Sequence, residues 1–160
     1  MDSPKLYAHL YRNYRSHELS GFCQFRVIAV LTSPITENFD NQSFKFRTFP
    51  KGLKVDFFDD KGQKSVVTAD YGIIYTQTNL IDLQGNVVID SYDGKKLKTD
   101  QLYFDNKNNW IFTEAAFTYT NPDDGTVMDG EGMDFNKDFS FFKANKTFGL
   151  MTIKEEEEQL

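Results

Sequence analysis

Hydrophobic and polar residues alternate through the middle of the chain with the two-residue period of β-strands, not the 3.6-residue period of helices. The pattern also repeats, because residues 68–75 (TADYGIIY) are echoed by residues 99–105 (TDQLYFD) and more faintly by residues 130–136 (GEGMDFN). Asp70 and Asp100 occupy the same place in the first two copies, 30 positions apart. A fixed period of this size is typical of stacked supersecondary units that share one apolar interior.

Turn residues separate the repeated units at regular intervals. Gly62, Gly94 and Gly125 each follow Asp or Lys residues, and Asx and Gly supply the backbone geometry of tight hairpins. The spacing predicts an antiparallel meander with strands of about eight to twelve residues. Three earlier runs also predict strands, at residues 22–31, 44–49 and 53–58.

The alternation predicts which side chains share one face of the sheet. Leu97 and Thr99 lie two residues apart, and a one-residue irregularity around Gln101 would put the following apolar residues on the same face. The same register, applied to the other units, predicts an inner apolar face. Its members are Ala69, Ile74, Ile81, Leu83, Val87, Ile89, Leu97, Leu102, Phe104, Ile111, Phe117, Tyr119 and Phe135.

The opposite face is more apolar than an antiparallel sheet usually exposes to water. By the same register it carries Tyr71, Ile73, Tyr103, Trp110 and Phe112. Either the two faces are less distinct than the alternation suggests, or part of the outer face is covered.

Length and charge narrow the function classes. A chain of 160 residues fits one domain, and its 16 Phe and 8 Tyr favour strands around a wide apolar interior. The net charge is −6, but four glutamates at 155–158 leave only −2 for the rest, which argues against an electrostatic nucleic-acid binder. Cys23 is the single cysteine, so no intramolecular disulfide can form.

The two ends of the chain differ from its middle. We expect residues 1–15 to form a separate segment, with a short helix beginning after Ser3, and residues 154–160 to form a solvated acidic tail. One β domain is expected between them, over residues 16–153. No stretch reaches the ~20 apolar residues that span a bilayer, and no secretory signal is visible. The sequence is therefore compatible with a cytoplasmic protein or with an exported one whose signal has been removed.

Motifs for catalysis or metal binding are incomplete. His17-Glu18 begins like a zinc-protease helix, but Gly21 stands where the second histidine is required. Two carboxylate pairs could lie on neighbouring strands, Asp70 with Asp100 and Asp82 with Glu114, which is the minimum that glycosidases need. We expect these four residues to be solvent-facing or structural, and therefore predict no enzyme, no metal site and no cofactor.

The repeated segments have the order and spacing that are found in a known protein family. Taken together they resemble the LptC family of periplasmic lipopolysaccharide-export proteins, in its Bacteroidetes-like form, over about residues 14–150. The segments that carry the resemblance are residues 49–55, 68–75, 83–89, 94–102 and 130–135.

The resemblance implies an all-β fold, an open and twisted V-shaped antiparallel β-jelly roll of the OstA-like type, built from strand-pair repeats. It implies an inner groove for the acyl chains of lipopolysaccharide, lined by the thirteen residues above, and no catalysis. It further implies a periplasmic location with an N-terminal tether to the inner membrane, which this sequence does not show.

The implied partners are lipopolysaccharide, an inner-membrane ABC transporter and an LptA-like bridge protein. The bridge protein would join the C-terminal edge strand, near residues 139–151, while an edge near residues 22–31 would face the transporter. Unpaired edges also allow an edge-to-edge homodimer. Two alternatives stay open: a closed β-barrel carrier of a small fatty acid, and a structural β-repeat protein that self-associates.

Overall fold

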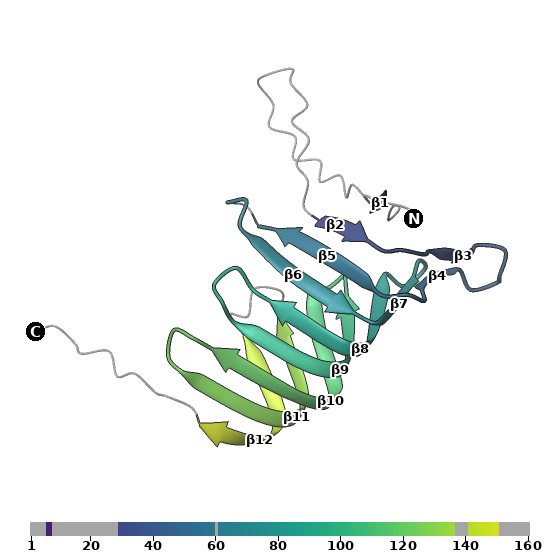
Figure 1. Cartoon of the computed structure of the whole chain (residues 1–160). Coiled ribbons are helices and arrows are strands. Elements are labelled where there is room, and N and C mark those ends of the chain that lie inside the picture. The colour runs from purple at the N-terminus through teal and green to yellow at the C-terminus, as the bar shows by residue number, and fades with distance from the viewer. Residues whose placement is uncertain (1–5, 8–28, 60, 137–140, 151–160) are drawn as a thin grey trace, which may run out of the picture.

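The computed structural model describes residues 6–7, 29–59, 61–136 and 141–150, and these form one antiparallel sheet without a helix (Figure 1). The fold is therefore all-β and open, as the sequence predicts. Its strands are β1 (Leu6–Tyr7), β2 (Ala29–Thr32), β3 (Glu37–Phe39), β4 (Phe46–Phe49), β5 (Leu53–Phe58), β6 (Lys64–Ala69), β7 (Tyr71–Tyr75), β8 (Leu80–Asp90), β9 (Lys96–Asp105), β10 (Trp110–Asn121), β11 (Thr126–Asn136) and β12 (Phe142–Leu150).

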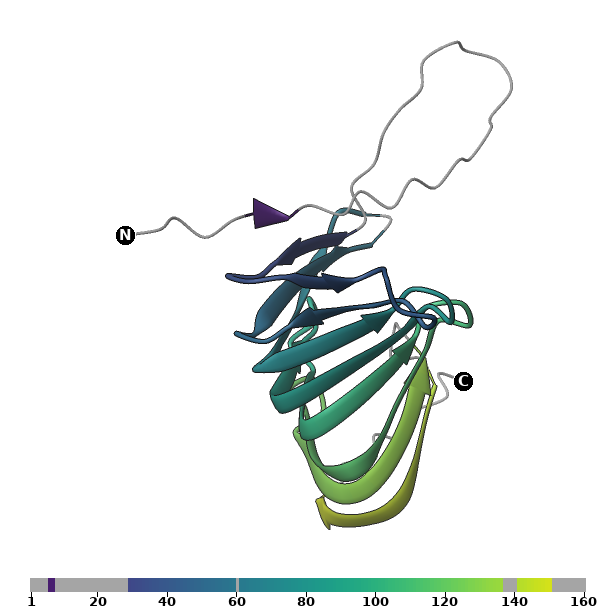
Figure 2. The ribbon, with the colours of Figure 1, turned by 90° about the vertical axis from the view of Figure 1, so that its right-hand side faces the viewer.

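The sheet divides into two wings at β8. The second half of β8 pairs with β6, which continues through β5 and β2 to β1. The first half of β8 pairs with β7, which continues through β4 to β3. We call the half of the sheet that contains β6 the first wing and the half that contains β7 the second wing. The later strands β9 to β12 run through both wings, and Figure 2 shows them curving where the wings meet.

Irregular backbone bends each long strand in its middle. In β8 the bend lies at Gly85 and Asn86, whose φ angles of 75° and 45° are left-handed. Asp70, between β6 and β7, holds this bend: its N–H donates to the Gly85 carbonyl at 2.9 Å, and its Oδ2 accepts from Asn86 Nδ2 at 2.6 Å. The repeated Asp70 position of the sequence is therefore a bend position.

The bend of β9 confirms the irregularity expected around Gln101. Before the bend the odd-numbered residues Leu97 and Thr99 are buried, and after it the even-numbered residues Leu102 and Phe104 are buried. The alternation of buried and exposed residues therefore shifts by one residue between Thr99 and Leu102. The hydroxyl of Thr99 donates to the Ala116 carbonyl at 2.9 Å. This bond gives the Ala116 carbonyl a partner at the point where the bend interrupts the pairing of β9 with β10.

The bend of β10 uses a second threonine. Thr113 is 1% exposed, donates its hydroxyl to the Gln101 carbonyl and accepts from the Ala115 N–H at 3.1 Å. Its hydroxyl also lies 3.3 Å from that of Thr99. Two buried threonines therefore join the bends of β9 and β10 and fix the angle between the wings.

The sheet does not close into a barrel. Among the described strands the sheet has three edges, at β1 in the first wing, at β3 in the second wing and at β12. Each of these edge strands pairs with a single neighbour, and no two of them pair with each other. The closed-barrel alternative is therefore wrong for the described part of the chain.

Several expectations for particular segments need correction or lie outside the described residues. Within residues 1–15 only Leu6–Tyr7 are described, and they form a strand, not a helix. Most of residues 22–31 and the expected acidic tail at residues 154–160 fall outside the described ranges. The two carboxylate pairs are not on neighbouring strands, because β8 separates Asp70 from Asp100 and β9 separates Asp82 from Glu114.

Candidate functional site

The inner faces of the two wings enclose an apolar space. Side chains from both wings border it, and serine is the only polar residue type among them. The lining consists of Leu31, Leu53, Val55, Phe57, Ser65, Val67, Ile74, Ile81, Leu83, Ile89, Leu102, Phe104 and Ile111. Its free volume is about 70 Å³.

The thirteen residues predicted for the groove are all buried or half-buried in the described structure. Seven of them line the apolar space. Ala69, Leu97, Tyr119 and Phe135 belong to the same apolar core without bordering the space, and Val87 and Phe117 are core residues that also border a separate hollow. The cross-strand register accounts for the shared face, since Ile81 lies opposite Phe104, and Phe104 lies opposite Ile111.

Two aromatic pairs bridge the wings. Phe57 of β5 and Phe104 of β9 meet edge to face, with ring centroids 6.4 Å apart. Tyr119 of β10 lies 5.8 Å from Phe142 of β12, between ring centroids. Burial raises the pKa of Tyr119 above its ordinary value. The first pair borders the space between the wings, whereas the second joins the wings away from it.

A glycine of β7 faces leucines of both wings near the bend. A Cβ atom at Gly72 would lie 2.7 Å from Cδ2 of Leu53 and 3.3 Å from Cδ2 of Leu83. Only a residue without a side chain lets the leucines of the two wings pack at this point.

Six lining residues were not among the predicted groove residues: Leu31, Leu53, Val55, Phe57, Ser65 and Val67. Three of them alternate with polar residues in β5 (LKVDFF), which is the same signal that identified the others. They were missed because β5 precedes the repeated units, from which the register was transferred.

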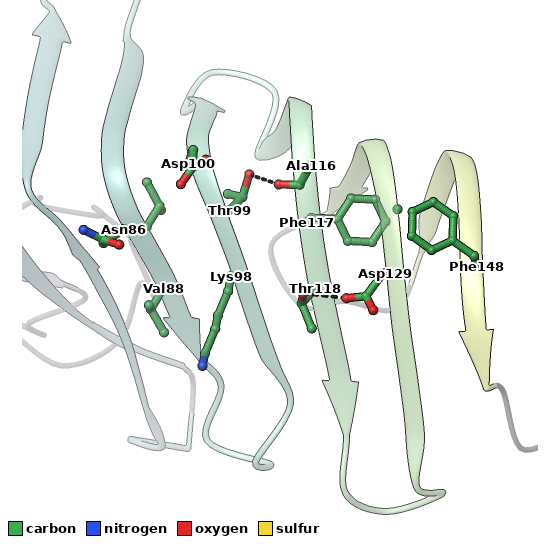
Figure 3. Close-up of a pocket in the computed structure, with 12 residues that line it drawn as sticks. Asn86, Val88, Lys98, Thr99, Asp100, Ala116, Phe117, Thr118, Asp129 and Phe148 are labelled. Carbon is green, nitrogen blue, oxygen red and sulfur yellow. Dashed lines mark hydrogen bonds between the residues drawn. The ribbon is translucent and has the colours of Figure 1, made fainter.

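A second, open hollow of about 460 Å³ lies on the first wing (Figure 3). Lys98, Asp100 and Asp129 border it together with threonine and apolar side chains, and Thr118 donates to Asp129 Oδ1 at 2.6 Å. Phe148 at its rim is 66% exposed. Mixed charges and an open shape suit water better than an acyl chain, so the enclosed space between the wings is the stronger candidate for an apolar ligand.

Neither a metal centre nor a membrane span is found in the parts of the chain that the structure describes. Those residues contain no group of three His, Cys, Asp or Glu side chains arranged to hold a metal ion. They also contain no helix that is long and apolar enough to cross a membrane.

Comparison with known proteins identifies the family of this fold. The family model described as lipopolysaccharide-assembly, LptC-related, matches residues 29–141, which is well over half of the chain. No curated protein is similar enough in sequence to count as a match. The matched region contains β2 to β11 and every residue that lines the enclosed space.

Proposed function

Because this chain belongs to the LptC family, whose role is in lipopolysaccharide export, we propose that the space between its wings holds the acyl chains of lipopolysaccharide during that export. The observation that carries the proposal is the continuous apolar inner face, to which both wings contribute. Each methylene that leaves water for such a surface contributes about 0.8 kcal/mol. Several acyl chains would therefore bind strongly without any polar contact.

The free volume indicates how lipid would enter. A free volume of about 70 Å³ leaves little room for an acyl chain, so we infer that the wings separate when lipid binds. The contact between Phe57 and Phe104 joins the wings directly and would break in that movement. Residues of the lining would then exchange contacts with each other for contacts with lipid, which lowers the net gain and permits release. A carrier that passes its cargo on needs such reversible binding.

Photo-crosslinking tests the groove with a control on the same strand. A photoreactive residue at Phe104 should capture lipopolysaccharide, whereas one at the neighbouring Tyr103, which points to the other face of β9, should not. Leu83 and Ile74 should behave like Phe104. Equal capture at Tyr103 and Phe104, with the fold intact, would disprove the groove.

We further propose that the partners are an inner-membrane ABC transporter, which loads the lipid, and an LptA-like bridge protein, which receives it in the periplasm. The edge strand β12 supports the second contact, because among the described strands it pairs only with β11. Lys146 of β12 is exposed, and its Nζ lies 3.2 Å from Oε2 of Glu131. A charged side chain on an edge strand discourages unselective pairing.

Removal of residues from 139 onward should abolish binding of the bridge protein and leave transporter binding in place. A photoreactive residue at Asn145 of the intact chain provides a second measurement that does not depend on truncation. It should crosslink to the bridge protein, while one at Asp90 in the first wing should not. Unchanged affinity of the folded truncated protein for the bridge protein would exclude transfer through this edge.

A further inference from the structure

The outer face of the second wing is rich in aromatic side chains. We call it the aromatic face, and define it by Tyr71, Ile73, Tyr75, Tyr103, Trp110 and Phe112, all half-buried. Tyr103 and Phe112 stack with ring centroids 5.0 Å apart, and Trp110 contacts Phe141 at 5.7 Å. The five residues expected on the outer face thus come from β7 (Tyr71, Ile73), β9 (Tyr103) and β10 (Trp110, Phe112), with β8 lying between β7 and β9.

A buried carboxylate lies at the centre of the aromatic face. Asp82 is 6% exposed and stands opposite Ile73 on one side and Tyr103 on the other. Its Oδ2 accepts from Gln84 Nε2 at 2.8 Å, and its Oδ1 accepts from Gln101 Nε2 at 3.1 Å. Both donors are neutral amides.

No cation neutralises this carboxylate within the described residues, where its hydrogen-bond donors are these two glutamine amides. The ion pairs of the sheet lie elsewhere, as between Lys96 and Asp90 in the first wing. Burial, and then the charge of Asp82, raise the pKa of Tyr75 and of Tyr103. The two hydroxyls therefore lie in the field of one uncompensated negative charge.

This combination is suited to a positively charged group. A guanidinium or ammonium group is attracted to the faces of tyrosine, tryptophan and phenylalanine rings, and more strongly when water is excluded. An adjacent carboxylate adds a Coulombic attraction that is larger at a covered surface than in bulk water. Gln101 Nε2 also donates to Tyr103 Oη at 2.7 Å, which leaves the tyrosine hydroxyl hydrogen available to a partner.

We propose that the aromatic face is a docking surface for a partner protein that places an arginine or lysine side chain over Asp82, between the rings of Tyr75 and Tyr103. The carboxylate selects the cation, and the surrounding rings bury the apolar neighbours of that residue. The charge favours a protein over a bilayer as the occupant. Asp82, Asp105 and Asp134 share this side of the sheet and outnumber Lys143, which lies opposite Asp134, so anionic lipids would be repelled. The docking surface is separate from the groove, which lies on the inner face.

Two peptides that differ only in charge test the proposal with the full chain. The probes are acetyl-Trp-Arg-Trp-amide and the same peptide with citrulline, the neutral isostere of arginine. Nuclear magnetic resonance titrations would follow the ring signals of Tyr75 and Tyr103. We expect the arginine peptide to bind roughly three- to thirtyfold more tightly, as one cation held over aromatic rings implies.

Variants assign that preference to the site. Asp82→Asn should reduce the ratio of the two affinities to about one, whereas Asp129→Asn, a carboxylate on the outer side of the first wing, should leave it unchanged. Tyr103→Leu gives a second measurement if Asp82→Asn does not fold, and it should lower the ratio as well. Equal binding of the two peptides to the parent protein would overturn the proposal, as would an unchanged ratio in Asp82→Asn.

Two further titrations address the other occupants. Vesicles of phosphatidylethanolamine and phosphatidylglycerol should leave the Tyr75 and Tyr103 signals unchanged, and so should increasing protein concentration. A response of these signals to vesicles would identify the face as a membrane contact, and a response to concentration would identify it as an interface between two copies. Either response, with no preference for the arginine peptide, would overturn the proposal.

Discussion

The two wings have similar inner faces but different outer faces. Inside, both contribute aliphatic and aromatic residues to one core. Outside, the first wing carries ion pairs and hydroxyl contacts, such as Lys96 with Asp90 at 2.9 Å and Thr118 with Asp129. The second wing carries stacked rings around Asp82. The shared inner face supplies the common core of the fold, so the two outer faces can differ in chemistry.

A single strand can contribute to both of these different outer faces. In β9 the first half places Lys98 outward and the second half places Tyr103 outward, on either side of the bend. An exposed ion pair contributes at most about 1 kcal/mol, so the charges of the first wing mainly keep it soluble. Aromatic pairs contribute about 0.5–1.5 kcal/mol beyond their burial, so the second wing gains stability from its outer face as well.

The largest effects are expected in the inner face, where the wings are alike. Leu97 and Leu102 are 0% and 2% exposed and lie on β9, one in each wing. Because each replacement by alanine leaves a cavity in the same core, Leu97→Ala and Leu102→Ala should each lower the free energy of unfolding by about 2–5 kcal/mol. Urea unfolding measures both. If only one of the two variants were strongly destabilised, the wings would not share a core.

The bend between the wings should be nearly as sensitive. Thr113→Val keeps the shape of the side chain but removes the oxygen that accepts from the Ala115 N–H. A buried N–H left without a partner costs about 1–3 kcal/mol. Thr120→Val on the outer side of β10 is the matched control, and it should change stability by less than about 0.5 kcal/mol. Thermal unfolding of the two variants should differ accordingly, and equal melting temperatures would show that the threonine bonds do not hold the bend.

The sequence predicts the fold well where one face is polar. In β9 the residues Leu97 and Thr99 alternate with exposed Lys98 and Asp100, so the facing and the bend at Gln101 could both be derived. The wings themselves were not derivable from alternation. They arise because β8 pairs with two different strands, a long-range contact that has no local signature.

The second wing shows the limit of the alternation more clearly. In β7 (YGIIY) apolar residues occupy both faces, so hydrophobicity does not distinguish inner Ile74 from outer Ile73. The burial of Asp82 was also not predicted. We expected a solvent-facing or structural carboxylate. It is covered, and its neighbours are Gln84 of the same strand, Gln101 and Tyr103 of β9 and Tyr75 of β7, an arrangement that only the strand register reveals.

A smaller effect should distinguish the outer faces themselves. Tyr103→Ala removes the ring that stacks on Phe112, and we expect a loss of about 1–2 kcal/mol in the free energy of unfolding. Lys98→Ala, on the outer face of the same strand in the first wing, should stay within about 0.5 kcal/mol of the parent. Chemical unfolding checks both variants. Equal losses would mean that the two outer faces contribute alike to stability, contrary to the comparison.

The smallest effect is electrostatic and concerns the tyrosines around Asp82. Burial first, and the negative charge of Asp82 second, raise the pKa of Tyr103 above 10.0, and the same causes raise the pKa of Tyr75. Asp82→Asn should therefore lower both pKa values, while Asp129→Asn in the first wing should change neither. Ring resonances followed by nuclear magnetic resonance from pH 9 upward measure these pKa values.

The same shifts set the direction of stability at high pH. Because the pKa of each tyrosine is higher in the folded than in the unfolded protein, its contribution to stability is complete below about pH 10 and is lost as the pH rises through the folded value. The free energy of unfolding of the parent should fall over this interval, and it should fall less steeply in Asp82→Asn, whose tyrosines titrate closer to their unfolded values. An identical decline in both proteins would show that Asp82 does not act on the aromatic face.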